Sequence, residues 1–203
     1  WLKFQILTPG DPPMRVGLLL DYKINLHGVP MKWQSEITRW DPPVGFTDEL
    51  ATGVSTLGAT TELADLKQHA ALDIGRYDKI VIGASIRYGK HQPLVKEFIE
   101  KHQETLEALP NALFSVNVVA RKPEKNTPET NPYLQKFLKQ IDWTPQTLGV
   151  FAGKLVYPDL GAFDRTMIRF IMWMTKGPTD PTGTYEFTNW DTVDEFGRTI
   201  AGL

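Results

Sequence analysis

One stretch decides the fold: Tyr77–His102, which reads YDKIVIGASIRYGKHQPLVKEFIEKH. Within it, Ile80–Ala84 is a short apolar run between polar residues, a pattern typical of a strand that is buried on both faces. Pro93 then opens a predicted helix whose apolar side chains recur at helical spacing as far as Leu106. A buried strand followed by an amphipathic helix is the repeating unit of a parallel α/β sheet.

The same alternation of strand and helix continues to the end of the chain. Further strands are predicted at Ala112–Val119 and Leu148–Ala152. Further helices are predicted after an Asn131 cap, over Ala162–Met174, and from about Thr188 onward. Consecutive pairs of this kind predict a doubly wound parallel sheet that is covered by helices on both faces.

The N-terminal residues do not follow this pattern. Val16–Leu20 is the one run there that resembles a buried strand, and no sustained helical period follows it before the pair Pro42–Pro43. We therefore predict two parts. Residues 1–61 form a poorly defined N-terminal segment, and residues 62–203 form an α/β domain.

Composition excludes several classes of protein. The 203 residues are 41% hydrophobic and 23% charged, as in a soluble globular domain, and the net charge of -2 does not indicate a nucleic-acid-binding surface. The absence of Cys excludes disulfides and thiolate metal sites, and it fits a reducing compartment. The four His residues lack metal-ligand spacing, so no metal site is predicted, and His91 and His102 are expected to be surface groups. No signal peptide or membrane-spanning run is recognised.

In a parallel sheet, ligands bind beyond the carboxyl ends of the strands. Three segments are predicted to lie there: Ser85–Gly89, Asn117–Lys122 and Gly153–Tyr157. The first combines a hydroxyl, an apolar side chain, a guanidinium, an aromatic ring and a glycine, which are the partners that a flat heteroaromatic ligand needs. The second is mildly basic and suits an acidic substrate or an anionic lipid. A plain surface loop is the alternative interpretation of both.

Several motifs, in order, resemble one known family. They are GASIRYG (Gly83–Gly89), SVNVVARKPEK (Ser115–Lys125), FAGKLVYP (Phe151–Pro158), FDRTMIRFIMWMTKG (Phe163–Gly177) and TNWDTVDEFGRTIA (Thr188–Ala201). Together they are similar to the flavodoxin-like, FMN-dependent protoporphyrinogen IX dehydrogenases (quinone) of proteobacteria, over about residues 62–203. The resemblance implies a flavodoxin-like doubly wound sheet. It also implies oxidation of protoporphyrinogen IX to protoporphyrin IX in haem biosynthesis, with a membrane quinone as the electron acceptor.

The resemblance further implies which residues hold the cofactor, FMN. Ser85–Gly89 is similar to the loop that flanks the isoalloxazine ring, with Tyr88 as a stacking partner, and Ser115–Arg121 is similar to the second flavin loop. The implied cofactor-binding residues are Ser85, Ile86, Arg87, Tyr88, Gly89, Ser115, Val116, Asn117, Val118, Val119, Ala120 and Arg121. Cationic side chains suit carboxylates, so the predicted partners of the porphyrin propionates are Arg87, Arg121 and Lys122. No catalytic side chain is assigned, because the cofactor carries the redox chemistry.

The chain departs from the family at the loop that binds the FMN phosphate. The family begins with a strand and a Ser/Thr-rich, Gly-containing loop at a helix N-terminus. Here Asp21–Asn25 follows the candidate strand and does not match, and Ser55–Thr60 imitates the composition but lies too close to Tyr77 to leave room for a helix and a second strand. A shifted reading frame, a wrong gene start or a divergent N-terminus would each explain this. We expect poor affinity for FMN as a consequence.

Two other functions stay open: a flavodoxin-type electron carrier or quinone reductase, and a degenerate chain that no longer binds FMN and acts at most as an interaction protein. Phe163–Met174 is too short to span a bilayer, but its apolar face and Trp173 suit the surface of a membrane. The alternative is a core helix that covers the sheet, and a mixed role would place Met172 and Trp173 outward. The expected location is therefore the cytoplasm, peripheral on the cytoplasmic face of the inner membrane.

Overall fold

A computed structural model of the chain describes residues 2–6, 19–26, 29–36, 54, 60–67, 72–87 and 89–203, the first three segments by their backbone. The chain divides into two units. The smaller comprises Trp1–Pro42 and Lys154–Glu186, and the larger comprises Pro43–Gly153 and Phe187–Leu203. The segment Lys154–Glu186 is therefore an excursion that leaves the larger unit and returns to it.

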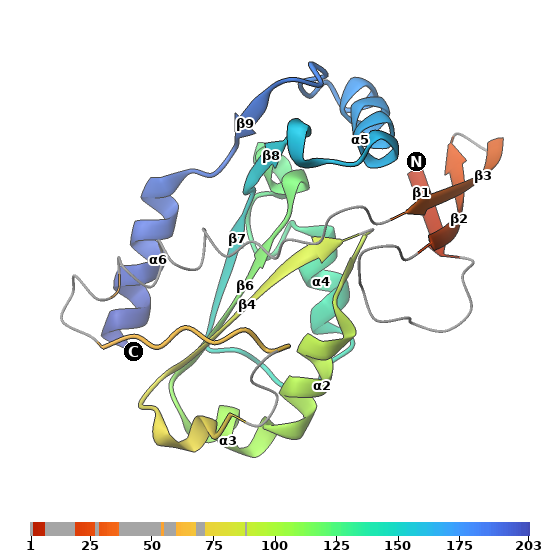
Figure 1. Cartoon of the computed structure of the whole chain (residues 1–203). Helices are drawn as coiled ribbons and strands as arrows, with labels where there is room; N and C mark the ends of the chain where they lie inside the picture. Colours follow the sequence, from red (N-terminus) through yellow and green to blue (C-terminus); the bar gives the residue numbers. More distant parts are fainter. Residues whose placement is uncertain are drawn as a thin grey trace. The chain divides into compact units, whose positions relative to one another are not determined.

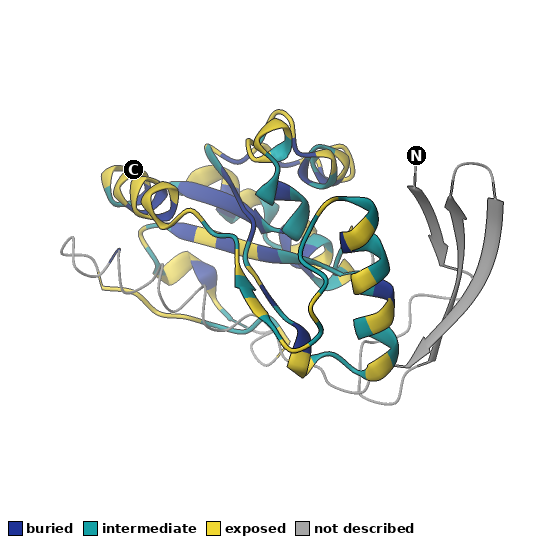
Figure 2. Ribbon diagram, turned by 90° about the horizontal axis from the view of Figure 1, so that it is seen from above, coloured by how far each residue is buried: buried dark blue, intermediate teal, exposed yellow. Residues whose placement is uncertain are grey.

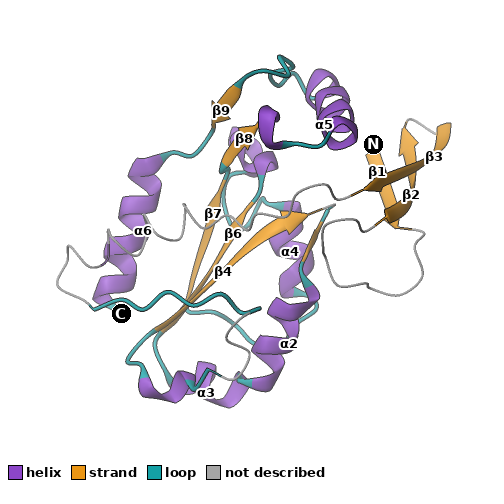
Figure 3. Cartoon of the chain, viewed as in Figure 1, coloured by secondary structure: helices purple, strands orange, loops and turns teal. Residues whose placement is uncertain are grey.

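The larger unit is built on a four-stranded sheet that is parallel except at one edge (Figures 1 and 3). Its strands are β4 (Ile80–Arg87), β5 (Lys90–His91), β6 (Asn111–Val116) and β7 (Thr147–Phe151), in the order β5-β4-β6-β7. Strand β6 pairs in parallel with both β4 and β7. Strand β5 turns back antiparallel on the end of β4. The parallel sheet predicted from the alternation of strands and helices is confirmed.

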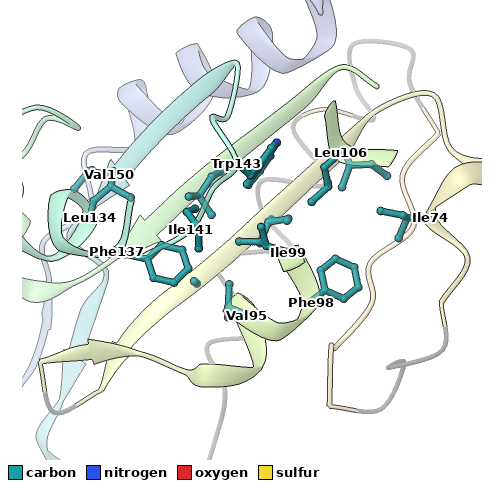
Figure 4. Close-up of a cluster of buried hydrophobic side chains, with 14 of the residues drawn as sticks. Ile74, Val95, Phe98, Ile99, Leu106, Leu134, Phe137, Ile141, Trp143 and Val150 are labelled. Carbon is teal, nitrogen blue, oxygen red and sulfur yellow. The ribbon is translucent and has the colours of Figure 1, made fainter. Parts of the chain in front are cut away.

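Helices cover both faces of this sheet. They are α2 (Pro93–Lys101), α3 (Gln103–Ala108) and α4 (Pro132–Leu138) on one side, and α6 (Trp190–Gly202) on the other (Figure 1). On the first side, Ile99, Leu106 and Leu134 are almost completely buried in one apolar cluster (Figure 4). Strand β6 is almost entirely buried, whereas β4 alternates between buried and exposed residues, and the C-terminal helix is exposed on its outer side (Figure 2). Burial of the inner face of each helix supplies most of the driving force for this packing.

Three phenylalanine rings form the core on the α6 side. The rings of Phe114, Phe151 and Phe196 meet edge to face, with centroids 5.5 to 6.1 Å apart. This is the arrangement that the charge distribution of aromatic rings favours. The Phe114 ring lies over Gly83 of the neighbouring strand, where an added Cβ would come within 2.3 Å of Phe114 Cζ. Glycine at position 83 therefore makes room for this ring.

Two helices begin at asparagine caps. Asn131 Oδ1 accepts hydrogen bonds from the N–H groups of Tyr133 and Leu134 at 3.2 and 3.1 Å, so the cap predicted for α4 is confirmed. At the start of α6, Asn189 Oδ1 accepts from the N–H of Asp191 at 3.1 Å. Both side chains satisfy donors that the first helical turn leaves without a backbone partner.

Two predicted elements are shorter than expected. The first helix ends at Lys101, because the backbone of His102 leaves helical geometry, with φ -114° and ψ 18°, before α3 begins. The strand predicted to reach Val119 ends at Val116. Its continuation turns away at Asn117, whose carbonyl accepts a hydrogen bond from the N–H three residues later. Hydrophobic patterning does not detect such turns, because both sides of them carry apolar residues.

The smaller unit contains two antiparallel sheets. One is a meander of β1 (Leu2–Ile6), β2 (Leu19–Leu26) and β3 (Val29–Glu36), and the other pairs β8 (Lys154–Val156) with β9 (Thr184–Glu186). The predicted strand Val16–Leu20 lies partly outside the described residues, and its last two residues open β2. Asp21–Asn25, which follows that run in the sequence, is part of the same strand. This region is therefore an extended hairpin and not the start of a parallel sheet.

Helix α5 (Ala162–Met174) has the predicted bounds. Met167 and Met172 are buried, so the prediction that Met172 points outward is wrong. The outward placement of Trp173 is confirmed, since this side chain is 69% exposed. The helix therefore buries two methionines and presents a tryptophan to solvent.

The excursion Lys154–Glu186 leaves and re-enters the larger unit at one point. The N–H of Phe187 donates to the carbonyl of Gly153 at 3.1 Å. Gly153 has a φ of +71°, and a Cβ there would lie 2.8 Å from Val116 Cγ1. Glycine is the residue that tolerates this conformation and this close approach. The exit from β7 is thus set by a single glycine.

Candidate functional site

The carboxyl ends of the parallel strands bring together two of the three predicted ligand-binding segments. Ser85 at the end of β4 lies in register with Val116 at the end of β6, and Val116 lies in register with Phe151 of β7. The third segment, Gly153–Tyr157, is divided between the two units, and the larger unit contains only its first residue. The candidate site in the larger unit is therefore formed by the loops that follow β4 and β6.

A tight hairpin follows β4. Ile86 and Arg87 pair with the two residues of β5, and Gly89 in the turn adopts a φ of +78°. Ser85, Ile86, Arg87 and Gly89 are all half-exposed. Tyr88, the predicted stacking partner of the ring, lies outside the described residues. The hairpin thus keeps the described members of the first predicted flavin loop accessible at the edge of the sheet.

The loop that follows β6 is compact. It contains two short 3-10 helices, η2 (Val118–Arg121) and η3 (Pro123–Lys125), and the N–H of Asn117 donates to the carbonyl of Phe151 at 2.8 Å. The predicted flavin residues fall into two groups here. Buried members are Ser115, Asn117 and Ala120, and half-exposed members are Val116, Val118, Val119 and Arg121. A ligand at this edge therefore meets the second group, while the first group shapes the loop beneath it.

A chain of four polar side chains runs beneath these loops. His91 Nε2 lies 2.9 Å from Ser115 Oγ, and Asn117 Nδ2 donates to the same hydroxyl at 3.2 Å. Asn131 Nδ2 donates to Asn117 Oδ1 at 3.0 Å and to the carbonyl of Lys125 at 2.9 Å. Ser115 and Asn131 are 0% exposed and Asn117 is 4% exposed. Because buried polar groups are costly without partners, these hydrogen bonds hold the loop to a single path.

The two histidines predicted at the surface are instead partly buried. The His91 ring packs against Phe137 and the His102 ring against Phe98, with centroids 4.5 and 4.6 Å apart. Burial lowers the pKa of both, that of His91 to about 4, so the His91 ring is neutral near pH 7. Sequence reasoning missed His91 because β5 is only two residues long and has no hydrophobic period.

Cationic side chains accompany the two loops. Arg87, Arg121 and Lys122, the predicted partners of propionates, are half-exposed. Lys67 was not singled out from the sequence, and nothing in its neighbouring residues distinguishes it. Burial lowers the pKa of Lys67; the nearby Asp65 opposes this effect and the positive charge of Arg87 adds to it. Lys67 is therefore a further positively charged side chain close enough to Arg87 for their charges to interact.

The described residues fit one part of FMN and not the other. Half-exposed apolar side chains at the edge of the sheet suit a flat ring: Ile86, Val116, Val118 and Val119. For the phosphate, none of the helices α2, α4, α5 and α6 begins on a Ser/Thr-rich loop that contains glycine. Ser55–Thr60 lies outside the described residues apart from Thr60, which is exposed. Among the described residues, the site therefore offers surfaces for the ring and no phosphate loop of the kind that the resemblance predicts.

Helix α5 of the smaller unit presents aromatic side chains and two arginines. The rings of Phe170 and the exposed Trp173 lie 6.1 Å apart. Arg165 donates to three backbone carbonyls between residues 157 and 160, and Arg169 Nε donates to the carbonyl of Thr179 at 2.9 Å. Both guanidinium groups therefore support the backbone around the helix.

Two classes of feature are missing from the part of the chain that the structure describes. No helix there is both long and apolar enough to cross a bilayer. Nor do the described residues gather three or more His, Asp or Glu side chains that would hold a metal ion. The candidate site is thus built from loops, apolar side chains and cations.

Comparison with known proteins identifies the family. The chain matches the family model of the flavodoxin domain over residues 45–182. It is 44% identical to the protoporphyrinogen IX dehydrogenase (quinone) of Escherichia coli K12 over 154 residues, which cover 76% of this chain and 85% of the relative. It is also 44% identical to the protein of the same name from Leishmania major, over 70% of this chain and 62% of that relative. No solved structure gives a significant match. The chain therefore belongs to the flavodoxin-domain family and, within it, to the protoporphyrinogen IX dehydrogenases (quinone).

Proposed function

We propose that this chain oxidises protoporphyrinogen IX to protoporphyrin IX, with FMN as cofactor and a membrane quinone as electron acceptor. The observation that carries the proposal is the 44% identity to enzymes named for this reaction, over 76% of the chain. The sheet supports it, because both predicted flavin loops lie at the carboxyl ends of neighbouring parallel strands, where this class of fold binds ligands. A bound flavin supplies the two-electron redox chemistry.

The residues of the chain have binding and orienting roles in this proposal. The half-exposed Ile86, Val116 and Val118 would provide the apolar contacts for a bound flavin ring. Arg121 and Lys122 pair with porphyrin propionates, as guanidinium and ammonium groups do with carboxylates. Oxidation removes six hydrogen atoms from the porphyrinogen and reduces three quinones to hydroquinones. These assignments require no acid or base from the side chains at this edge.

The reaction itself tests the proposal. Purified chain, FMN, protoporphyrinogen IX and a soluble quinone are mixed without oxygen, since oxygen oxidises porphyrinogens unaided. We expect porphyrin fluorescence to rise together with hydroquinone, in a ratio of one porphyrin to three hydroquinones. A second mixture contains chemically reduced FMN in place of the porphyrinogen. Quinone reduction that the chain accelerates in this mixture, without porphyrin formation in the first, would instead indicate an electron carrier or quinone reductase. The absence of both reactions would indicate a chain that has lost the activity.

We predict that the chain discriminates little between FMN and riboflavin. The two ligands share the ring and differ in the phosphate, so their ratio of dissociation constants isolates the phosphate site. Hydrogen bonds to charged groups contribute about 1.5–3 kcal/mol each, so a loop with several such bonds favours FMN by at least about 100-fold. Without that loop we expect a ratio within about 5-fold, measured by quenching of flavin fluorescence. A ratio of 100 or more would show that another segment binds the phosphate.

We also propose that α5 rests on a membrane surface, which would give the enzyme access to a lipid-soluble quinone. Trp173 is 69% exposed, and a tryptophan ring is well suited to the boundary between headgroups and acyl chains. Replacing Trp173 with Ala should weaken binding to vesicles of anionic phospholipid by at least about 10-fold, because a large apolar side chain contributes about 1.5–3 kcal/mol when buried. Co-sedimentation measures this loss.

Trp190, which is also exposed and lies within the described residues, provides a matched control for the membrane prediction. Trp190 is 37% exposed at the start of α6, so Trp190→Ala should bind vesicles as the unaltered chain does. Equal loss in both variants would indicate nonspecific adsorption. Retention of the unaltered protein in the supernatant would refute the membrane contact altogether.

A further inference from the structure

The side chain of His91 connects the two loops of the candidate site. His91 belongs to the hairpin that follows β4, and its Nε2 lies 2.9 Å from Ser115 Oγ at the end of β6. We infer that His91 is a positioning residue for the flavin ring: its hydrogen bond to Ser115 ties the first loop to the second and fixes the distance between them. This inference rests on the proposed function, since it takes these two loops to be the ones that hold the ring.

The pairing of the strands explains why the connection forms beneath the loops. Ser115 lies in register with Ala84 on β4 and Val150 on β7, both of which belong to the buried cluster on the α2 and α4 side. Its hydroxyl therefore points to that side of the sheet and is 0% exposed. The His91 ring reaches it from the same side, packed against Phe137 of α4. The ring can thus hold the loops together without occupying the space in which a ligand would bind.

The connection continues past Ser115 to the far end of the second loop. Asn117 Nδ2 donates to Ser115 Oγ, and Asn131 Nδ2 donates to Asn117 Oδ1 and to the carbonyl of Lys125. Asn117 opens the loop and Asn131 closes it at the start of α4. One hydrogen-bonded chain therefore links the hairpin to both ends of the loop that carries Arg121 and Lys122. We therefore expect a substitution at His91 to weaken the other hydrogen bonds between Ser115, Asn117 and Asn131 as well.

The protonation state of His91 agrees with this role. Burial lowers the pKa of His91 to about 4, so the ring is uncharged near neutral pH. An uncharged ring keeps one nitrogen as an acceptor and one as a donor, so it can bond to a hydroxyl without placing a charge beneath the ligand. The ring thereby orients the loops without adding a charge. The positive charges of the site come from the cationic side chains of the two loops.

Two substitutions test the connection from its two sides. His91→Phe keeps an aromatic ring against Phe137 and removes Nε2, and Ser115→Ala removes the hydroxyl and little volume. Each should weaken riboflavin binding by about 2- to 10-fold, the range expected for one lost hydrogen bond, and should change the visible absorption spectrum of the bound flavin. His91→Gln, which returns a polar atom near the position of Nε2, should restore part of the affinity.

The second histidine provides a matched control. His102 is likewise partly buried and packs against a phenylalanine ring, but its Nε2 has no hydrogen-bond partner among the described residues. His102→Phe should therefore bind riboflavin with unchanged affinity. Hydrogen–deuterium exchange of the free protein gives a reading without flavin: amides of residues 117–131 should exchange faster in His91→Phe and not in His102→Phe.

The outcomes separate this inference from the proposed function. If the unaltered chain binds riboflavin, and His91→Phe and Ser115→Ala bind it equally well with unchanged spectra, the positioning role is refuted and the flavin site stands. Loss of affinity in His102→Phe as large as in His91→Phe would also refute it, because the loss would then be a general effect of altering a partly buried ring. If the unaltered chain binds neither riboflavin nor FMN, the proposed function fails and the inference falls with it.

Discussion

Replacing Phe114 with Ala is expected to lower the free energy of unfolding by about 3–5 kcal/mol, the range for removing a buried aromatic side chain. Phe114 is 2% exposed and its ring contacts both Phe151 and Phe196, so its removal leaves a cavity against these two rings. Urea unfolding followed by tryptophan fluorescence, to which the buried Trp143 contributes, measures the change. Val81→Ala, at a site that is 38% exposed on the neighbouring strand, should cost less than about 1 kcal/mol.

A second substitution shows where the Phe114 ring lies. A Cβ on Gly83 would come within 2.3 Å of Phe114 Cζ, so Gly83→Ala should destabilise the native chain by about 1–3 kcal/mol through overpacking. In the Phe114→Ala background the added methyl group meets a cavity instead. The double variant should therefore be more stable than the sum of the two single changes by more than about 1 kcal/mol. If the two changes in the free energy of unfolding simply add in the double variant, the Phe114 ring does not lie over Gly83.

Replacing Asn131 with Ala is expected to cost about 2–4 kcal/mol, more than a helix cap usually contributes. The side chain caps α4 through Oδ1, and through Nδ2 it satisfies Asn117 Oδ1 and the carbonyl of Lys125. Its removal thus leaves buried acceptors without donors as well as an uncapped helix. The measurement is again urea unfolding, followed by far-ultraviolet circular dichroism.

A substitution at the cap of α6 serves as a reference that separates the two contributions of Asn131, the helix cap through Oδ1 and the hydrogen bonds donated by Nδ2. Asn189 accepts from Asp191 at an exposed position, so Asn189→Ala should cost about 1 kcal/mol, the value of a cap alone. Asn131→Asp keeps the accepting oxygen but, when ionised, has no N–H to donate, so we expect it to be nearly as unstable as Asn131→Ala. If Asn131→Ala costs no more than Asn189→Ala, the hydrogen-bonded chain beneath the loops contributes no stability.

The parts of the fold that could be predicted are those with local causes. Ile80–Ala84 is a strand because five apolar residues stand between polar ones, and α5 has the predicted bounds because its apolar residues recur at helical spacing. Asn131 could be assigned as a cap from the proline that follows it. In each case the determining interactions lie within a few residues of one another, where sequence patterns report them.

The parts that could not be predicted depend on contacts between distant polar residues. His91 bonds to Ser115 and Asn131 bonds to Asn117, across 24 and 14 positions of sequence. Neither pair leaves a period in hydrophobicity, and β5 is too short to show one. The predicted flavin residues came instead from resemblance to a family. Which of them are buried and which half-exposed became apparent only once the loop after β6 was seen to turn at Asn117.

The hydrogen bond between Phe187 and Gly153 bears on how chains of this family can diverge. Because it joins the two ends of Lys154–Glu186, the sheet imposes no length on the residues between them. Doubling the length of a flexible loop costs only about 0.6 kcal/mol in closure entropy. The turns of the excursion can therefore change in length at little cost to the sheet. Its helix and strands are a different case, because Tyr157, Met167 and Met172 are buried, so we expect insertions in the turns and not within α5.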